Sequence, residues 1–191
     1  MMIDPTFIWQ HPGWPDHLRW DPRAVLPVLA ETRRLQGHLL GRVTGLGVDL
    51  GPDFHADTLV LDAVRTAAVE GDMLDPEGVR SSVARRLGPP TAGRIGPTRA
   101  IDGLVAMLID ATEGASQPLT TERLHGWHAG LFPTGHSGIH RITVAAWRAG
   151  TEPMQVVSGG LEATRVHVEA PPSERIPVEM QRFLSWWSRP A

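Results

Sequence analysis

The sequence contains no cysteine and no lysine. Without cysteine, the chain has no disulfide, no thiolate nucleophile and no cysteine-bound metal. Without lysine, lysine-based Schiff-base chemistry and phosphate binding by a lysine ammonium group are excluded within this chain. No apolar run approaches the roughly 18–20 residues that a membrane-spanning helix needs, and no basic segment leads into an apolar core at the N-terminus. We therefore expect a cytoplasmic protein without a membrane span or a signal peptide.

The sequence also carries little net charge, −3 over 191 residues. Hydrophobic residues make up 41% and charged residues 20%, the balance of an ordinary soluble globular protein. The length suits one domain, or a domain with a small appendage. Because no overall positive field exists, we do not expect this segment to bind nucleic acid.

The first 21 residues are predicted to form an arm. Three tryptophans and three prolines in so short a stretch favour extended chain over helix. The rings of Trp9, Trp14 and Trp20 are too large to stay in water. We therefore expect the arm to pack on the rest of the protein.

Helical patterns dominate the remaining sequence. We predict helices over residues 22–45 (beginning at Pro22 or at Pro27), 52–69, 76–87, 97–113, 120–132 and from about 176 onward. In the first, Gly37 and Gly41 suggest a close helix crossing. In the second, the residues expected to face inward are Val60, Leu61, Val64, Ala67 and Ala68. A β-prone run covers residues 142–147, and two further runs flanking Gly159 and Gly160 predict a hairpin at about 154–169.

Glu70 is the unusual residue of the second predicted helix. Gly71 is typical of the position just past a helix C-terminus, which places Glu70 in the last turn. There a carboxylate opposes the helix macrodipole, at a cost of a few tenths of a kcal/mol up to ~1 kcal/mol. Thr66 lies four residues earlier, on the same helix face. Taken alone, Glu70 is either a solvated surface residue or a residue held there for a cationic partner such as arginine.

Two segments resemble Fic-family proteins, the Fic/Doc AMP transferases. One is the inhibitory-helix pattern Ser/Thr-x-x-x-Glu-Gly, read here as Thr66-Ala67-Ala68-Val69-Glu70-Gly71, with Val79-Arg80-Ser81-Ser82-Val83-Ala84-Arg85-Arg86-Leu87-Gly88 after the turn. The other is the opening Trp9-Gln10-x-Pro12-x-Trp14-Pro15-x-x-x-x-Trp20-Asp21, similar to the N-terminal module of one Fic subgroup. The resemblance implies that Thr66, Glu70 and Gly71 are regulatory. In that family the motif glutamate pairs with an active-site arginine and obstructs productive ATP binding.

The hairpin at about 154–169 resembles the flap of the same family. The resemblance implies that Arg165, Val166, His167 and Val168 line the nucleotide and target cleft, where the flap aligns a protein target by strand pairing. The implied fold is mainly α, a helical bundle of Fic/Doc type with a β-hairpin flap. Its implied divisions are an arm (1–21), a helical module with the inhibitory helix (22–95) and the N-terminal part of the Fic core (96–191).

The family's defining segment, His-Pro-Phe-x-Asp/Glu-Gly-Asn-Gly-Arg, is absent from these 191 residues. We therefore expect no catalytic residue here, and an N-terminal part of an AMP transferase whose C-terminal catalytic helices are missing and which is inactive as given. ATP and Mg²⁺ serve the full-length family, and neither is expected to bind this chain alone. Uncovered apolar surface at Trp186, Trp187 and the second helix would favour a homodimer.

Two other interpretations remain open. The first is a stand-alone, antitoxin-like binding module that supplies Glu70 in trans to a catalytic partner. The second is an unrelated helical interaction protein with a metal site at His125, His128, His136 and His140. Since no carboxylate lies between the first two histidines as in a zincin motif, we expect no metal.

Overall fold

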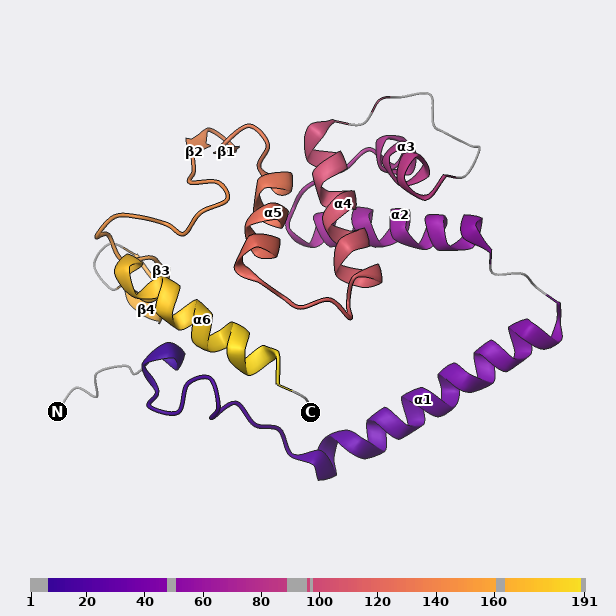
Figure 1. Ribbon diagram of the computed structural model, residues 1–191, viewed down its shortest axis with the longest axis horizontal. Helices are drawn as coiled ribbons and strands as arrows, with labels where there is room; N and C mark the ends of the chain where they lie inside the picture. The colour runs from indigo at the N-terminus through magenta and orange to yellow at the C-terminus, as the bar shows by residue number, and fades with distance from the viewer. Residues whose placement is uncertain (1–6, 48–50, 89–95, 97, 161–163, 190–191) are drawn as a thin grey trace. The chain divides into compact units, whose positions relative to one another are not determined.

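The computed structural model describes residues 7–47, 51–88, 96, 98–160 and 164–189. These residues form six α-helices, two small antiparallel hairpins and two short 3-10 turns (Figure 1). The prediction of a mainly helical fold that carries a β-hairpin is thereby confirmed. No helix in this part of the chain combines the length and apolarity that crossing a membrane requires.

The helix bounds follow the local signals of the sequence closely. The helices are α1 (Pro22–Gly45), α2 (Pro52–Val69), α3 (Pro76–Leu87), α4 (Arg99–Glu113), α5 (Thr121–Leu131) and α6 (Ile176–Trp187). The strands are β1 (His136–Ser137), β2 (His140–Arg141), β3 (Gln155–Ser158) and β4 (Arg165–Glu169), and the 3-10 turns are η1 (Ile8–Gln10) and η2 (Ser173–Arg175). Asp21 caps α1, so the helix begins at Pro22 and includes Pro27. The predicted fourth-helix start at Pro97 lies outside the described residues.

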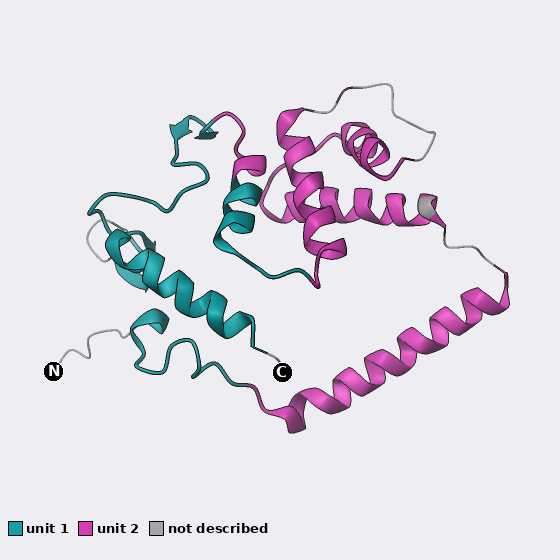
Figure 2. Ribbon diagram, viewed as in Figure 1, with its two compact units in different colours: residues 1–19, 117–128, 135–191 teal, residues 20–116, 129–134 magenta. Residues whose placement is uncertain are grey.

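The chain divides into two compact units, each described by itself below (Figure 2). Unit 1 contains residues 1–19, 117–128 and 135–191, and unit 2 contains residues 20–116 and 129–134.

The core of unit 2 lies between α2, α3 and α4. Its buried side chains are Leu59, Val60, Ala63, Val79, Val83, Ile101 and Val105. Val60 and Ala67 are buried as predicted, but the prediction for Leu61 and Ala68 was wrong, because both are exposed. Apolar residues occupy more than one face of α2, and contact with α3 and α4 decides which face is covered.

A single carboxylate joins α3 to α4. Asp102 Oδ1 accepts hydrogen bonds from Ser82 Oγ (2.6 Å), Arg85 Nη2 (2.8 Å) and Arg86 Nη1 (3.1 Å). Arg86 also donates to the Asp102 carbonyl oxygen (2.9 Å). Partial burial acts to raise the pKa of Asp102, but the hydrogen bonds from Ser82, Arg86 and Arg85 outweigh it and lower this pKa below its ordinary value.

A close backbone crossing lies between α4 and the end of α5. A Cβ atom placed on Gly103 would lie 1.8 Å from the Gly130 carbonyl oxygen. At Gly37 and Gly41, where the sequence predicted such a crossing, nothing lies within 4 Å of an added Cβ. That prediction was wrong, since α1 has no buried residue.

Two further sequence predictions, one for unit 1 and one for the arm, need correction. Residues 142–147 do not form a strand. The Ala145 backbone has a φ of +53°, which is not extended, and its N–H donates to His128 Nδ1 (3.3 Å) instead of to a neighbouring strand. In the arm, Trp9 is buried and Trp14 is half-buried. Trp20, which falls in unit 2, is 70% exposed and is not packed as predicted.

We expect Asp102→Asn to lower the free energy of unfolding at pH 7 by about 1–2 kcal/mol, because charge-assisted hydrogen bonds are lost at a partly exposed site. A lowered folded-state pKa stabilises the fold above the unfolded-state pKa of about 3.9, and this contribution disappears as the pH falls through the folded-state value. In urea unfolding, the difference from wild type should therefore stay constant from pH 7 to about pH 5 and shrink as the pH falls below about 4. Asp62→Asn, at an exposed position on α2, is the control, and a difference independent of pH would contradict the assignment.

We expect Gly103→Ala to destabilise the protein by about 1–3 kcal/mol, since the added methyl group would overlap backbone atoms of Gly130. Gly37→Ala is the matched control: it adds the same methyl group to a helix position with open space and should stabilise by about 0.5–1 kcal/mol. Melting temperatures of the two variants would check this, and two shifts of the same sign would refute the crossing.

Candidate functional site

Glu70 ends α2 in a fixed backbone geometry. It is the C-cap residue, and Gly71 follows with a φ of +87°. The Gly71 N–H donates to the Ala68 carbonyl (3.1 Å) and the Asp72 N–H donates to the Ala67 carbonyl (2.9 Å). These two bonds are the Schellman motif, which satisfies the last carbonyls of the helix.

The next helix begins with an equally defined cap. The Asp75 carboxylate accepts from the backbone N–H groups of Glu77 (3.3 Å) and Gly78 (3.0 Å). A Cβ atom on Gly78 would lie 3.2 Å from the Ile101 side chain, so α3 packs closely on α4 at its first turn. The short connection that carries Glu70 is therefore held at both ends.

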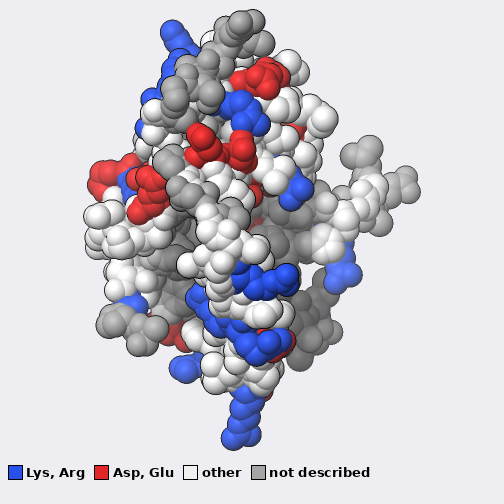
Figure 3. Space-filling view, turned by 90° about the vertical axis from the view of Figure 1, so that its right-hand side faces the viewer, with Lys and Arg blue, Asp and Glu red and all other residues white. Residues whose placement is uncertain are grey.

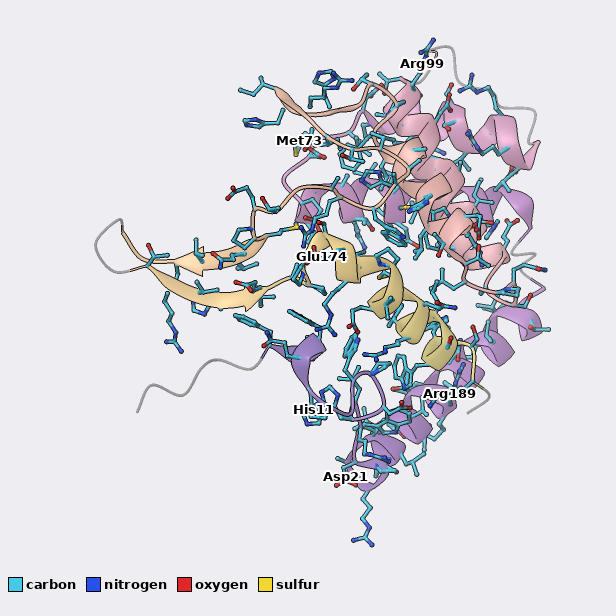
Figure 4. The ribbon with its side chains drawn as sticks, turned by 60° about the vertical axis from the view of Figure 1, so that its left-hand side comes forward. His11, Asp21, Met73, Arg99, Glu174 and Arg189 are labelled. Carbon is cyan, nitrogen blue, oxygen red and sulfur yellow. The ribbon has the colours of Figure 1, made fainter. Side chains whose placement is uncertain are left out.

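The side chain of Glu70 takes no part in holding this turn. It is exposed, and within the described part of the chain its carboxylate makes no hydrogen bond or ion pair. Thr66 is exposed one helical turn earlier. Two apolar neighbours, Val69 and Met73, are 84% and 91% exposed, and Figure 4 labels Met73 in the connection after α2. The result is an unpaired carboxylate beside uncovered apolar surface.

Charged side chains of both signs lie on the surface elsewhere. In the space-filling view of Figure 3, arginines and carboxylates both occupy the visible face. Several of them are paired across helices, such as Arg80 with Asp57 and His55 with Glu113 (3.2 Å). Glu70 differs from these carboxylates in having no such partner among the described residues.

The predicted flap is a hairpin with a β-bulge. Val156 is opposite Val168 and Val157 is opposite Val166, so His167 has no partner residue on β3. A bulge redirects side chains and breaks the alternation of a strand. His167 Nε2 lies 2.6 Å from Ser158 Oγ on the facing strand. The imidazole is thus tied within the hairpin.

The hairpin leaves most of its side chains in solvent. Arg165, His167 and Val168 are exposed and Val166 is half-buried. The structure therefore brings the four predicted flap residues together on β4 in unit 1, whereas Thr66, Glu70 and Gly71 lie in unit 2. Of the aromatic pair expected to be uncovered, Trp187 is exposed and Trp186 half-buried.

The histidines do not assemble a metal centre in the described residues, where no group of three His, Asp or Glu side chains could hold an ion. His125 contacts the edge of the Trp147 ring, with centroids 4.5 Å apart, and its Nε2 is buried without a hydrogen-bond partner among the described residues.

Glu179 on α6 is a buried charged residue that the sequence analysis did not predict, and it is only 4% exposed. Arg175 and Arg182, four residues before it and three after, were the available signal, because helical neighbours at these spacings pair.

We expect Gly71→Ala to destabilise the protein by about 1–2 kcal/mol, because an L-residue is strained at positive φ. Gly126→Ala is the matched control on α5, where an added Cβ meets no atom within 4 Å and the backbone has no positive φ. Chemical unfolding of both variants would measure the difference. Equal stability of the two would mean that Gly71 does not have the assigned conformation.

Comparison with known proteins adds one match. Residues 7–88 match the family described as a domain of unknown function (DUF4172). No curated protein matches the chain. The match covers residues 7–21 of the arm and α1 to α3, including Thr66, Glu70 and Gly71, and it ends at the C-cap of α3. It covers less than half of the 191 residues and does not include the hairpin.

Proposed function

We propose that this chain is the regulatory and flap portion of a Fic-family AMP transferase, which moves AMP from ATP to a protein hydroxyl group. In this proposal Glu70 is the inhibitory glutamate, and β4 contributes the strand that aligns the target. The catalytic motif and the groups that bind ATP and Mg²⁺ belong to a polypeptide segment outside these 191 residues. The chain alone is inactive and binds no ATP.

The observation that carries the proposal is the exposed carboxylate of Glu70, which has no partner among the described residues. The backbone of the turn is fully capped without it, and the carboxylate opposes the helix macrodipole at the end of α2. A residue that does not stabilise its own turn, yet is held at a fixed place beside exposed Val69 and Met73, suits an arginine on a docked surface. Thr66 lies on the same exposed face and would border that contact.

The hairpin gives independent support. Among the described residues no third strand pairs with β3–β4, so an outer edge of this hairpin, apart from the Glu169 carbonyl that Trp9 contacts, can accept an extended segment by backbone hydrogen bonds. The bond between His167 and Ser158 favours a supporting role for this imidazole over that of a general base.

The test is inhibition of AMP transfer. The wild-type chain is added to a polypeptide that carries the His-Pro-Phe-x-Asp/Glu-Gly-Asn-Gly-Arg motif, with labelled ATP and Mg²⁺, and AMP transfer to protein is measured. We expect the wild-type chain to suppress transfer. The Glu70→Gln chain should need a concentration at least about tenfold higher for the same suppression, because the charge that pairs with arginine is lost.

Asp62→Asn removes an exposed carboxylate from the same helix and should inhibit as well as wild type. Inhibition by Glu70→Gln equal to that of wild type would contradict the role of Glu70. No inhibition by any of the three proteins would contradict the proposal as a whole.

The trans-acting alternative rests on the same free carboxylate, since the partner of Glu70 is outside the described residues in both versions. Reading the gene beyond codon 191 separates them. The catalytic motif in the same frame indicates regulation within one protein, whereas the motif in a separate gene indicates an antitoxin-like module.

A further inference from the structure

The N-terminal arm contacts the base of the hairpin through Trp9. Trp9 lies in η1 and is 8% exposed. Its indole Nε1–H donates to the carbonyl oxygen of Glu169, the last residue of β4, at 2.7 Å. The two residues are 160 positions apart in the sequence, so this hydrogen bond joins the start of the chain to the hairpin.

The hairpin register explains why this carbonyl is available. The Ala170 N–H donates to the Met154 carbonyl at 2.9 Å, next to the Gln155–Glu169 pair. In an antiparallel ladder, hydrogen-bonded and non-hydrogen-bonded pairs alternate, so the main-chain groups of Glu169 point away from β3. Trp9 therefore occupies the outer edge of β4 at its C-terminal end.

A second contact fixes Trp9 to the start of α6. The Arg175 guanidinium carbon lies 5.0 Å from the centre of the Trp9 ring, within the range of a cation–π interaction. Arg175 also donates to Glu179 at 2.6 Å, and Arg182 contacts the same buried carboxylate at 3.4 Å. The Trp9 ring thus contacts both the hairpin base and Arg175, whose partner carboxylate on Glu179 is buried.

Trp14 lies in the same arm and makes no comparable contact. Its Nε1 is buried without a hydrogen-bond partner among the described residues. It lines a hollow of about 490 Å³ beside Val178 and Arg182 of α6. Trp14 and α6 therefore border a common hollow, whereas the hydrogen bond to the hairpin belongs to Trp9.

We propose that Trp9 is a positioning residue for the hairpin: its indole N–H and its contact with Arg175 hold the C-terminal end of β4 against α6. In this arrangement the arm determines the position of the β4 edge with which a bound segment would pair. The consequence for target alignment rests on the proposed function, whereas the anchoring itself does not.

Amide hydrogen exchange of the full 191-residue chain tests this inference. We expect Trp9→Phe, which keeps an aromatic ring and removes the N–H donor, to speed exchange of the β3, β4 and Ala170 amides roughly two- to tenfold. The amides of α2 to α4 in unit 2 should keep their rates. Trp14→Phe makes the same change in the same arm without losing an observed hydrogen bond, and it should leave the hairpin rates unchanged.

Unchanged hairpin exchange in Trp9→Phe would overturn the inference. So would acceleration spread equally over the hairpin and unit 2, because Trp9 would then support the whole fold rather than the hairpin. Equal acceleration by Trp14→Phe would overturn it as well, since loss of ring volume would be the cause. The measurement needs no nucleotide or catalytic partner, so a failed inhibition assay leaves this result standing.

Discussion

Unit 2 depends on the hydrogen bonds to Asp102. The α3 helix has 12 residues, a length at which an isolated helix is marginal in water, so α3 must be held by its neighbours. Ser82 is fully buried on that helix, and a buried hydroxyl without a partner costs about 1–3 kcal/mol. Asp102 accepts from this hydroxyl and from two arginines at once, which joins a polar contact to the apolar core beside it.

The consequence reaches the end of α2. Because α3 is fixed against α4 and packs on α2 through the shared core, the connection between α2 and α3 has little freedom. The Schellman bonds close one end of that connection and the Asp75 cap closes the other. Backbone groups and the Asp75 carboxylate make the hydrogen bonds of this connection, and the Glu70 carboxylate makes none with the described residues. The helix macrodipole disfavours a carboxylate at this position, so Glu70 does not stabilise the turn that carries it.

The sequence predicted the elements whose signals are local. The bounds of α3 were correct because Asp75, Pro76 and Gly88 mark its ends, and those of α2 because Pro52 and Gly71 do the same. The prediction of which residues of α2 face inward was partly wrong. Leu59 and Leu61 are equally apolar, and only contact with other helices distinguishes them.

Features that depend on distant partners were missed for the same reason. A helical glycine weakens any helix, so Gly37 and Gly103 look alike in the sequence, and only the fold brings Gly130 against one of them. The bulge at His167 likewise depends on the register of two strands. Of the candidate site, the glutamate and its turn were predictable, whereas the bond between Trp9 and Glu169 was not, because nothing local pairs residues so far apart.

The two features of the proposed function lie in different compact units, Glu70 in unit 2 and β4 in unit 1. Each is complete in its own unit: the turn is capped within unit 2, and the hairpin is anchored by Trp9 within unit 1. The two features can therefore be altered separately: a substitution at Glu70 leaves the hairpin anchor of unit 1 in place, and a substitution at Trp9 leaves the turn of unit 2 capped.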